Sequence, residues 1–195
     1  NMRVMEIMSH STNTIAEGEV LQLLNCHDAS TTELRYLQVI HYKTAKLFES
    51  ASQIGAIIHQ ADSETENAMA KYGMHLGTAF QIIDDVMDYN ANETEMGKNV
   101  GDDLAEGKPT LPLIYAIQHG NKEQSALIKK AIEQGGLDQI TEIMLAINET
   151  GALDYSRKIA KQEAQKAINY LSILKPSKYK QALIDLAHFS IERSY

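Results

Sequence analysis

The stretch QIIDDVMDY, residues 81–89, places three aspartates, Asp84, Asp85 and Asp88, inside an otherwise apolar run with helical spacing. Asp84 and Asp88 share one helix face, where two like charges cost roughly 0.2–0.5 kcal/mol. Mg²⁺ binds one or two protein carboxylates and completes its octahedron with water and phosphate oxygens. The pattern therefore predicts a Mg²⁺ site, and an exposed acidic face is the alternative.

Small residues precede the aspartates on the same stripe of the predicted helix. At about 100° per residue, one side of this helix carries Gly73, Gly77, Gln81, Asp84 and Asp88. A glycine inside a helix costs up to about 1 kcal/mol against alanine, so it indicates the close approach of a ligand or of another backbone. The stripe favours either a ligand beside Gln81 or close helix packing.

A polar pair interrupts the apolar face of the preceding helix. In HYKTAKLFESA, residues 41–51, Thr44 falls within that face and Lys43 lies at its edge. We expect the pair to reach a phosphate in a central cavity. The alternative is that Lys43 extends along the surface and that Thr44 bonds to the helix backbone.

The segment ANETEMGKNVGDDLAEGKPTLP, residues 91–112, is the one stretch without a plain helical pattern. A connection of this length is often functional. Its lysines, Lys98 and Lys108, follow the aspartate helix, and we expect them to close over a polyphosphate that a metal ion holds. A solvated, charged loop is the alternative.

The same segment carries a second acidic group, Asp102, Asp103 and Glu106, with the i, i+1, i+4 spacing of the first. Glycines flank this group, so its geometry is less fixed than that of residues inside a helix. We therefore expect these carboxylates to pair with neighbouring lysines rather than to form a rival metal site.

These residues must be positioned by helices, because apolar residues recur at intervals of three and four and only three prolines occur. The spacing predicts an all-α fold in a single domain, residues 1–195. A capped start of the third helix is predicted at Asp62 and Ser63, with Glu66 following. The predicted helices are 2–24, 32–60, 62–91, 110–119, 121–134, 136–149, 151–172 and 176–193.

Composition argues against several classes of function. The net charge is −8, from 18 Lys plus Arg and 26 Asp plus Glu, so the chain lacks the basic surface of a protein that binds nucleic acid. The single cysteine, Cys26, cannot form an intrachain disulfide, which fits the cytoplasm. No apolar run approaches the ~20 residues of a transmembrane helix. A di-iron helical bundle would need Glu-x-x-His motifs, and the sequence has none.

Together these segments resemble the trans-isoprenyl diphosphate synthases. GTAFQIIDDVMDY followed by GKNVGDDLAEGKPTLPLIYA is similar to the second aspartate-rich motif of that family and the loop after it. EGEVLQL at 17–23 and YKTAKLFESA at 42–51 are similar to the two preceding segments of the family, in order and spacing. The resemblance covers essentially the whole chain and implies a helical bundle of the isoprenoid synthase type.

The resemblance also implies an activity. Enzymes of this family add isopentenyl diphosphate to an allylic diphosphate, such as farnesyl diphosphate, and they are typically homodimers. For this chain the likeness implies a long all-trans polyprenyl diphosphate of the octaprenyl type, used for quinone side chains. Mg²⁺ and lysines would stabilise the departing pyrophosphate.

The resemblance also implies roles for individual residues in the matching motifs. Asp84 would ligate Mg²⁺, with Asp85 and Asp88 as further ligands or as supporting groups. The groups implied in catalysis are Asp84, Asp85, Lys43 and Lys98. The groups implied in binding the allylic diphosphate are Lys43, Thr44, Gln81, Lys98 and Lys108.

The chain also departs from the family pattern. The family has two aspartate-rich motifs, and the first does not occur in this sequence, nor do the basic residues that bind isopentenyl diphosphate. We therefore expect the C-terminal portion of a synthase, lacking the N-terminal helices and unable to elongate a prenyl chain alone. The alternatives are a non-catalytic helical partner subunit of a prenyl synthase, a class I terpene cyclase, and a helical interaction module.

Overall fold

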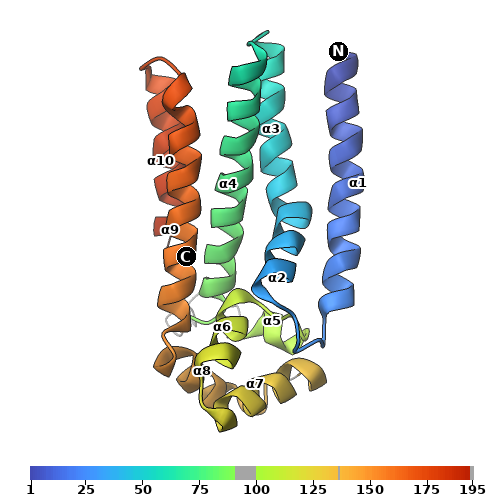
Figure 1. Cartoon of the computed structure of the whole chain (residues 1–195), viewed down its shortest axis with the longest axis vertical. Helices are drawn as coiled ribbons and strands as arrows, with labels where there is room; N and C mark the ends of the chain where they lie inside the picture. Colours follow the sequence, from blue (N-terminus) through green and yellow to red (C-terminus); the bar gives the residue numbers. More distant parts are fainter. Residues whose placement is uncertain (91–99, 136, 194–195) are drawn as a thin grey trace. The chain divides into compact units, whose positions relative to one another are not determined.

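The computed structural model describes residues 1–90, 100–135 and 137–193, and within them it contains helices and no strand (Figure 1). The all-α prediction is therefore confirmed. The helices are α1 (Met2–Asn25), α2 (Glu33–Ile40), η1 (His41–Ala45), α3 (Lys46–Ile58), α4 (Ser63–Met87), α5 (Asp102–Ala105), α6 (Leu111–His119), α7 (Lys122–Gln134), α8 (Ile140–Glu149), α9 (Ala152–Tyr170), η3 (Leu171–Ile173) and α10 (Lys178–Glu192).

Contacts divide the chain into two compact units. Unit 1 contains residues 1–19, 39–81 and 159–193, and unit 2 contains residues 20–38 and 82–158. The single domain expected from the sequence stays a prediction. Among the described residues, no helix is long and apolar enough to cross a membrane.

Unit 1 is built from long helices around a small apolar core. Figure 1 shows α9 beside α10. The buried residues of this core come from α4, α9, η3 and α10, and they are Tyr72, Leu76, Ala167, Leu171 and Ala187. The predicted cap before α4 is confirmed in part, because the Asp62 carboxylate accepts a hydrogen bond from the backbone N–H of Thr65 at 2.7 Å.

Unit 2 is built from shorter helices, among which α6 packs against α7 and α8. Pro112 lies in the first turn of α6, where the missing N–H of proline costs no intrahelical bond. Asn121 and Gln124 form a reciprocal capping box at the start of α7. Ile128, Ile132 and other apolar residues of α6, α7 and α8 form a buried core.

The helix predicted over 32–60 is divided in the structure by a single π-helical turn, η1, between α2 and α3. Such turns bond i to i+5, and they often occur at functional sites. This turn contains Lys43 and Thr44, the polar pair identified from the sequence. Gly18 of α1 lies so close that a Cβ added there would stand 2.5 Å from the backbone nitrogen of Lys43.

The glycines of α4 serve close helix packing. A Cβ on Gly73 would overlap the carbonyl oxygen of Phe48, and one on Gly77 would lie 2.7 Å from Cα of Ala45. The sequence left open whether these glycines make room for a ligand or for another helix. At Gly73 and Gly77 the structure shows close packing against the backbone of η1 and α3. The third predicted helix also ends earlier than expected, at Met87 instead of residue 91.

Candidate functional site

The three aspartates near the end of α4 differ in exposure. Asp85 is only 4% exposed and Tyr89, four residues on, is fully buried, whereas Asp84 and Asp88 are half-buried. Residues four apart share a helix face, so this turn has a buried Asp85–Tyr89 face and a more accessible Asp84–Asp88 face. Asp84 and Asp88 are therefore the pair that can meet a ligand from solvent.

Asp85 is bonded inside unit 2. The Tyr36 hydroxyl, on α2, donates to Oδ2 of Asp85 at 2.6 Å, and Tyr36 is itself 5% exposed. Burial and the negative charge of Asp85 raise the pKa of Tyr36 well above its usual value, so the phenol stays a donor. Sequence reasoning missed Tyr36, because nothing in the spacing marks a residue 49 positions before its partner.

Asp88 lies just after α4 and forms hydrogen bonds with Gly101 and with Asp103 of α5. The backbone N–H of Asp103 donates to Oδ2 of Asp88 at 3.2 Å, and the N–H of Gly101 donates to the Asp88 carbonyl at 2.9 Å. Burial, with the negative charge of Asp103 nearby, raises the pKa of Asp88 to about 7. A cation bound at this carboxylate would favour its ionised form.

Lys108 is held by the second acidic group. Its Nζ lies 2.9 Å from Oδ1 of Asp103 and 2.8 Å from Oε2 of Glu106. The predicted pairing of this acidic group with a neighbouring lysine is confirmed for these two carboxylates. Burial opposes the charge of Lys108, but Glu106 and Asp103 outweigh it and raise the lysine pKa above its usual value. Asp103 thus contacts two of the predicted site residues, Asp88 and Lys108.

The other described site residues belong to unit 1. The Thr44 hydroxyl donates to Oε1 of Gln81 at 2.9 Å, so η1 and α4 bring these two predicted residues together. Nζ of Lys43 lies 2.7 Å from Oε2 of Glu19, with the lysine side chain 35% exposed. Lys98, predicted to bind diphosphate, lies outside the described residues.

The carboxylates suit a cation that also binds other ligands. Among the described residues, no group of three or more His, Cys, Asp or Glu side chains is arranged to hold a metal ion. Mg²⁺ does not require one, because it usually keeps water and phosphate oxygens beside one or two carboxylates. Asp84 and Asp88 match this requirement in number, in ligand type and in access to solvent.

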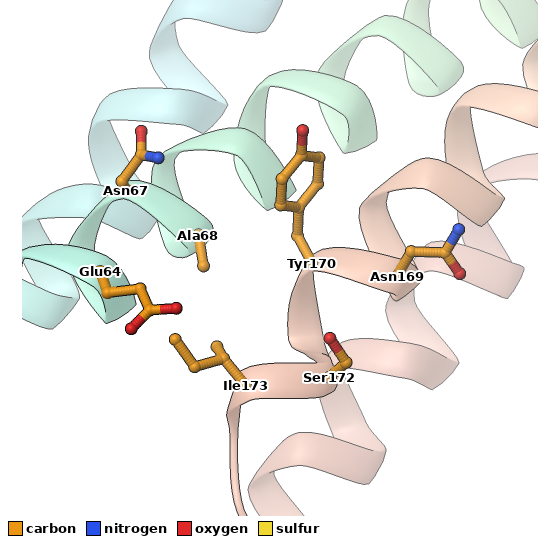
Figure 2. Close-up of a pocket in the computed structure, with 7 residues that line it drawn as sticks. All are labelled: Glu64, Asn67, Ala68, Asn169, Tyr170, Ser172 and Ile173. Carbon is orange, nitrogen blue, oxygen red and sulfur yellow. The ribbon is translucent and has the colours of Figure 1, made fainter.

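A pocket of about 380 Å³ lies in unit 1 (Figure 2). Its lining residues come from the start of α4, the end of α9 and η3, and they are Glu64, Asn67, Ala68, Asn169, Tyr170, Ser172 and Ile173. None of the residues predicted from the sequence lines this pocket. It therefore gives no support for the predicted chemistry.

Comparison with known proteins places this fold and aspartate motif in a family. Residues 1–149 match the family model of polyprenyl synthetases, and the chain therefore belongs to that family. The octaprenyl diphosphate synthase of Haemophilus influenzae is 53% identical over 196 residues, which cover 100% of this chain and 60% of that protein. The match confirms the resemblance drawn from the motifs.

Solved structures agree with the fold. A decaprenyl diphosphate synthase from Rhodobacter capsulatus superposes with a TM-score of 0.92 at 41% identity, covering 100% of this chain and 61% of that one. A polyprenyl synthase from Caulobacter crescentus, complexed with calcium and isoprenyl diphosphate, gives 0.93 at 36% identity, covering 100% and 60%. The isoprenoid synthase fold is confirmed, and the chain spans about 60% of the length of these relatives.

Proposed function

We propose that the chain is part of a trans-polyprenyl diphosphate synthase, which joins isopentenyl diphosphate to an allylic diphosphate such as farnesyl diphosphate. Family membership and the similarity to the Haemophilus influenzae synthase support the proposal. The proposed product is a long all-trans chain of the octaprenyl type for quinone side chains. Its length rests on sequence identity, since the similar proteins carry octaprenyl and decaprenyl names.

The observation that carries the proposal is the accessible Asp84–Asp88 face beside the buried Asp85. In the proposal Asp84 and Asp88 hold Mg²⁺ against the allylic diphosphate, and Asp85 supports them. Mg²⁺ held there would supply positive charge to the pyrophosphate leaving group. The calcium in the Caulobacter crescentus complex is consistent with a divalent cation in this family.

Lysines supply the rest of the positive charge in the proposal. Lys108 is held in place by Asp103 and Glu106 before the ligand arrives, so binding requires only that a phosphate oxygen replace or join one of these partners. Lys43 and Lys98 are proposed as further diphosphate contacts and catalytic groups. Thr44 and Gln81, already bonded to each other, are proposed as polar diphosphate contacts.

The proposal includes a homodimer in the cytoplasm. Support for an interface comes from α1, which exposes large apolar side chains that a monomer would leave in water, among them Met2, Met5, Val20, Leu23 and Leu24. Sedimentation equilibrium would give twice the chain mass if these side chains lie between two copies.

Two alternative functions have less support. A non-catalytic partner subunit would have no use for Asp84 and Asp88 as an accessible carboxylate pair, but both are present. A terpene cyclase shares the metal chemistry, but the similar proteins reported above are named as chain-elongating synthases. Both comparisons therefore favour the elongating enzyme.

Product formation tests the proposed function. A chimera would join this chain to the portion of the Haemophilus influenzae synthase that it does not match, which would supply the first aspartate-rich motif. With farnesyl diphosphate, labelled isopentenyl diphosphate and Mg²⁺, we expect long-chain product from the chimera and none from the 195-residue chain alone. An Asp84→Asn chimera should be inactive. A folded chimera without product would contradict the proposal.

A further inference from the structure

We propose that Tyr36 is a positioning residue of the metal site, whose hydroxyl fixes Asp85 so that Asp84 and Asp88 face the cation. This inference rests on the proposed function, because it concerns a residue that acts behind the proposed ligands. It assigns a role in Mg²⁺ binding to a helix, α2, that contains none of the residues identified from the sequence motifs.

The contact has the properties of a fixed internal support. Tyr36 and Asp85 are both almost completely buried, at 5% and 4% exposure, and their oxygens are 2.6 Å apart. A buried carboxylate loses its hydration and requires hydrogen-bond donors in compensation. A bond from hydroxyl to carboxylate at this distance is of the strong, charge-assisted kind. The hydrogen bond from Tyr36 therefore holds the Asp85 carboxylate in the interior of unit 2.

The position of Asp85 controls the orientation of its neighbours. Successive residues of a helix differ by about 100°, so fixing Asp85 sets the direction of the preceding Asp84 and of Asp88, which shares the face of Asp84. The same buried face also carries Tyr89, whose hydroxyl oxygen accepts a long hydrogen bond from Thr110 Oγ1 at 3.4 Å. Without Tyr36, the last turn of α4 would lose a constraint on its rotation about the helix axis.

The test compares two buried tyrosines. Tyr36→Phe removes only the hydroxyl that reaches Asp85. Tyr72→Phe removes the hydroxyl of another buried tyrosine, which donates to the Leu183 carbonyl at 2.9 Å in unit 1, and it serves as the matched control. The measured quantity is the Mg²⁺ concentration that half-saturates calorimetric binding of an inert thio-analogue of farnesyl diphosphate.

We expect Tyr36→Phe to raise this Mg²⁺ concentration about tenfold, the usual scale of losing a hydrogen-bonding group behind the ligands of a metal site. Binding should return at saturating Mg²⁺, because the ligands themselves remain. Tyr72→Phe should stay within about twofold of the parent chain. Circular dichroism of both variants would show that each is folded.

Asp85→Asn gives a second, independent test. Asparagine keeps an oxygen that accepts from Tyr36 but is a much poorer Mg²⁺ ligand than a carboxylate. If Asp85 acts by position, Asp85→Asn should lower the Mg²⁺ affinity much less than Asp84→Asn does. Equal loss in both would overturn the inference, even if Tyr36→Phe failed to fold.

The remaining outcomes separate the two proposals. Binding by Tyr36→Phe at the parental Mg²⁺ concentration would overturn the role of Tyr36 and leave the proposed function standing. Equal weakening in Tyr36→Phe and Tyr72→Phe would also overturn it, because a general loss of stability would explain both. Absence of Mg²⁺-dependent binding in the parent chain would contradict the proposed diphosphate site itself, and the inference would fall with it.

Discussion

Nδ1 of His75 and Oε2 of Glu163 lie 2.6 Å apart and join α4 to α9 within unit 1. Both side chains are only 13% exposed, and Lys166 also reaches Glu163, at 2.7 Å. Burial alone would raise the pKa of Glu163, but the hydrogen bonds from His75 and Lys166 outweigh it and lower that pKa from its usual value of 4.5. The contact therefore stabilises the fold only while Glu163 is ionised.

This contact predicts a pH dependence of stability. A lowered carboxyl pKa means that the unfolded chain binds more protons near pH 4, so the stabilisation is present above about pH 4.5 and is lost as the pH falls through the lower, folded-state value. Glu163→Gln should reduce the free energy of unfolding at pH 7 by about 1–3 kcal/mol. Urea unfolding should show a smaller difference in unfolding free energy between the parent chain and Glu163→Gln at pH 3.5 than at pH 7. Glu133→Gln, exposed on α7, is the control, and a loss equal at both pH values would contradict the assignment.

The close packing of α4 against α3 predicts opposite effects for two similar substitutions. Gly73→Ala would place a methyl group against the backbone carbonyl of Phe48, and we expect a loss of about 1–3 kcal/mol in unfolding free energy. A Cβ at Gly55 of α3 would meet nothing within 4 Å, so Gly55→Ala should stabilise by up to about 1 kcal/mol through helix propensity. Thermal unfolding measures both effects. An unchanged stability of Gly73→Ala would contradict the close packing of α4 against α3 at this position.

Substitution of Lys108 is expected to lower the affinity for the diphosphate ligand. Replacing it with methionine keeps the aliphatic stem but removes the ammonium group that Asp103 and Glu106 hold. Since a hydrogen bond to a charged group contributes about 1.5–3 kcal/mol, Lys108→Met should weaken Mg²⁺-dependent binding of the thio-analogue at least about tenfold. Lys130→Met, exposed on α7, should bind like the parent chain. Equal affinities of the parent chain, Lys108→Met and Lys130→Met would show that Lys108 does not bind the diphosphate.

Local sequence signals predicted the helices well, because they depend on neighbours along the chain. Apolar spacing gave most helix ranges within a few residues, and Asp62 was recognised as a cap that the structure confirms. The pairing of Lys108 with Asp103 was also predictable, since the two are five positions apart. In these cases the energy that decides the structure lies within a short segment.

Contacts between distant segments could not be predicted in the same way. The bond from Tyr36 to Asp85 spans 49 positions, and the one from His75 to Glu163 spans 88, so no spacing rule connects them. The π-helical turn at His41–Ala45 was missed because its residues also fit an ordinary helix. The sequence identified the three aspartates but not the burial that separates Asp85 from Asp84 and Asp88.

The most direct test of the central claim is calorimetric binding of the thio-analogue of farnesyl diphosphate to the parent chain and to Asp84→Ala, each with and without Mg²⁺. Our account predicts binding that requires Mg²⁺ in the parent chain and is lost in a folded Asp84→Ala variant. Binding that is unchanged by Asp84→Ala, or that does not depend on Mg²⁺, would contradict the claim that these aspartates hold a diphosphate through a metal ion.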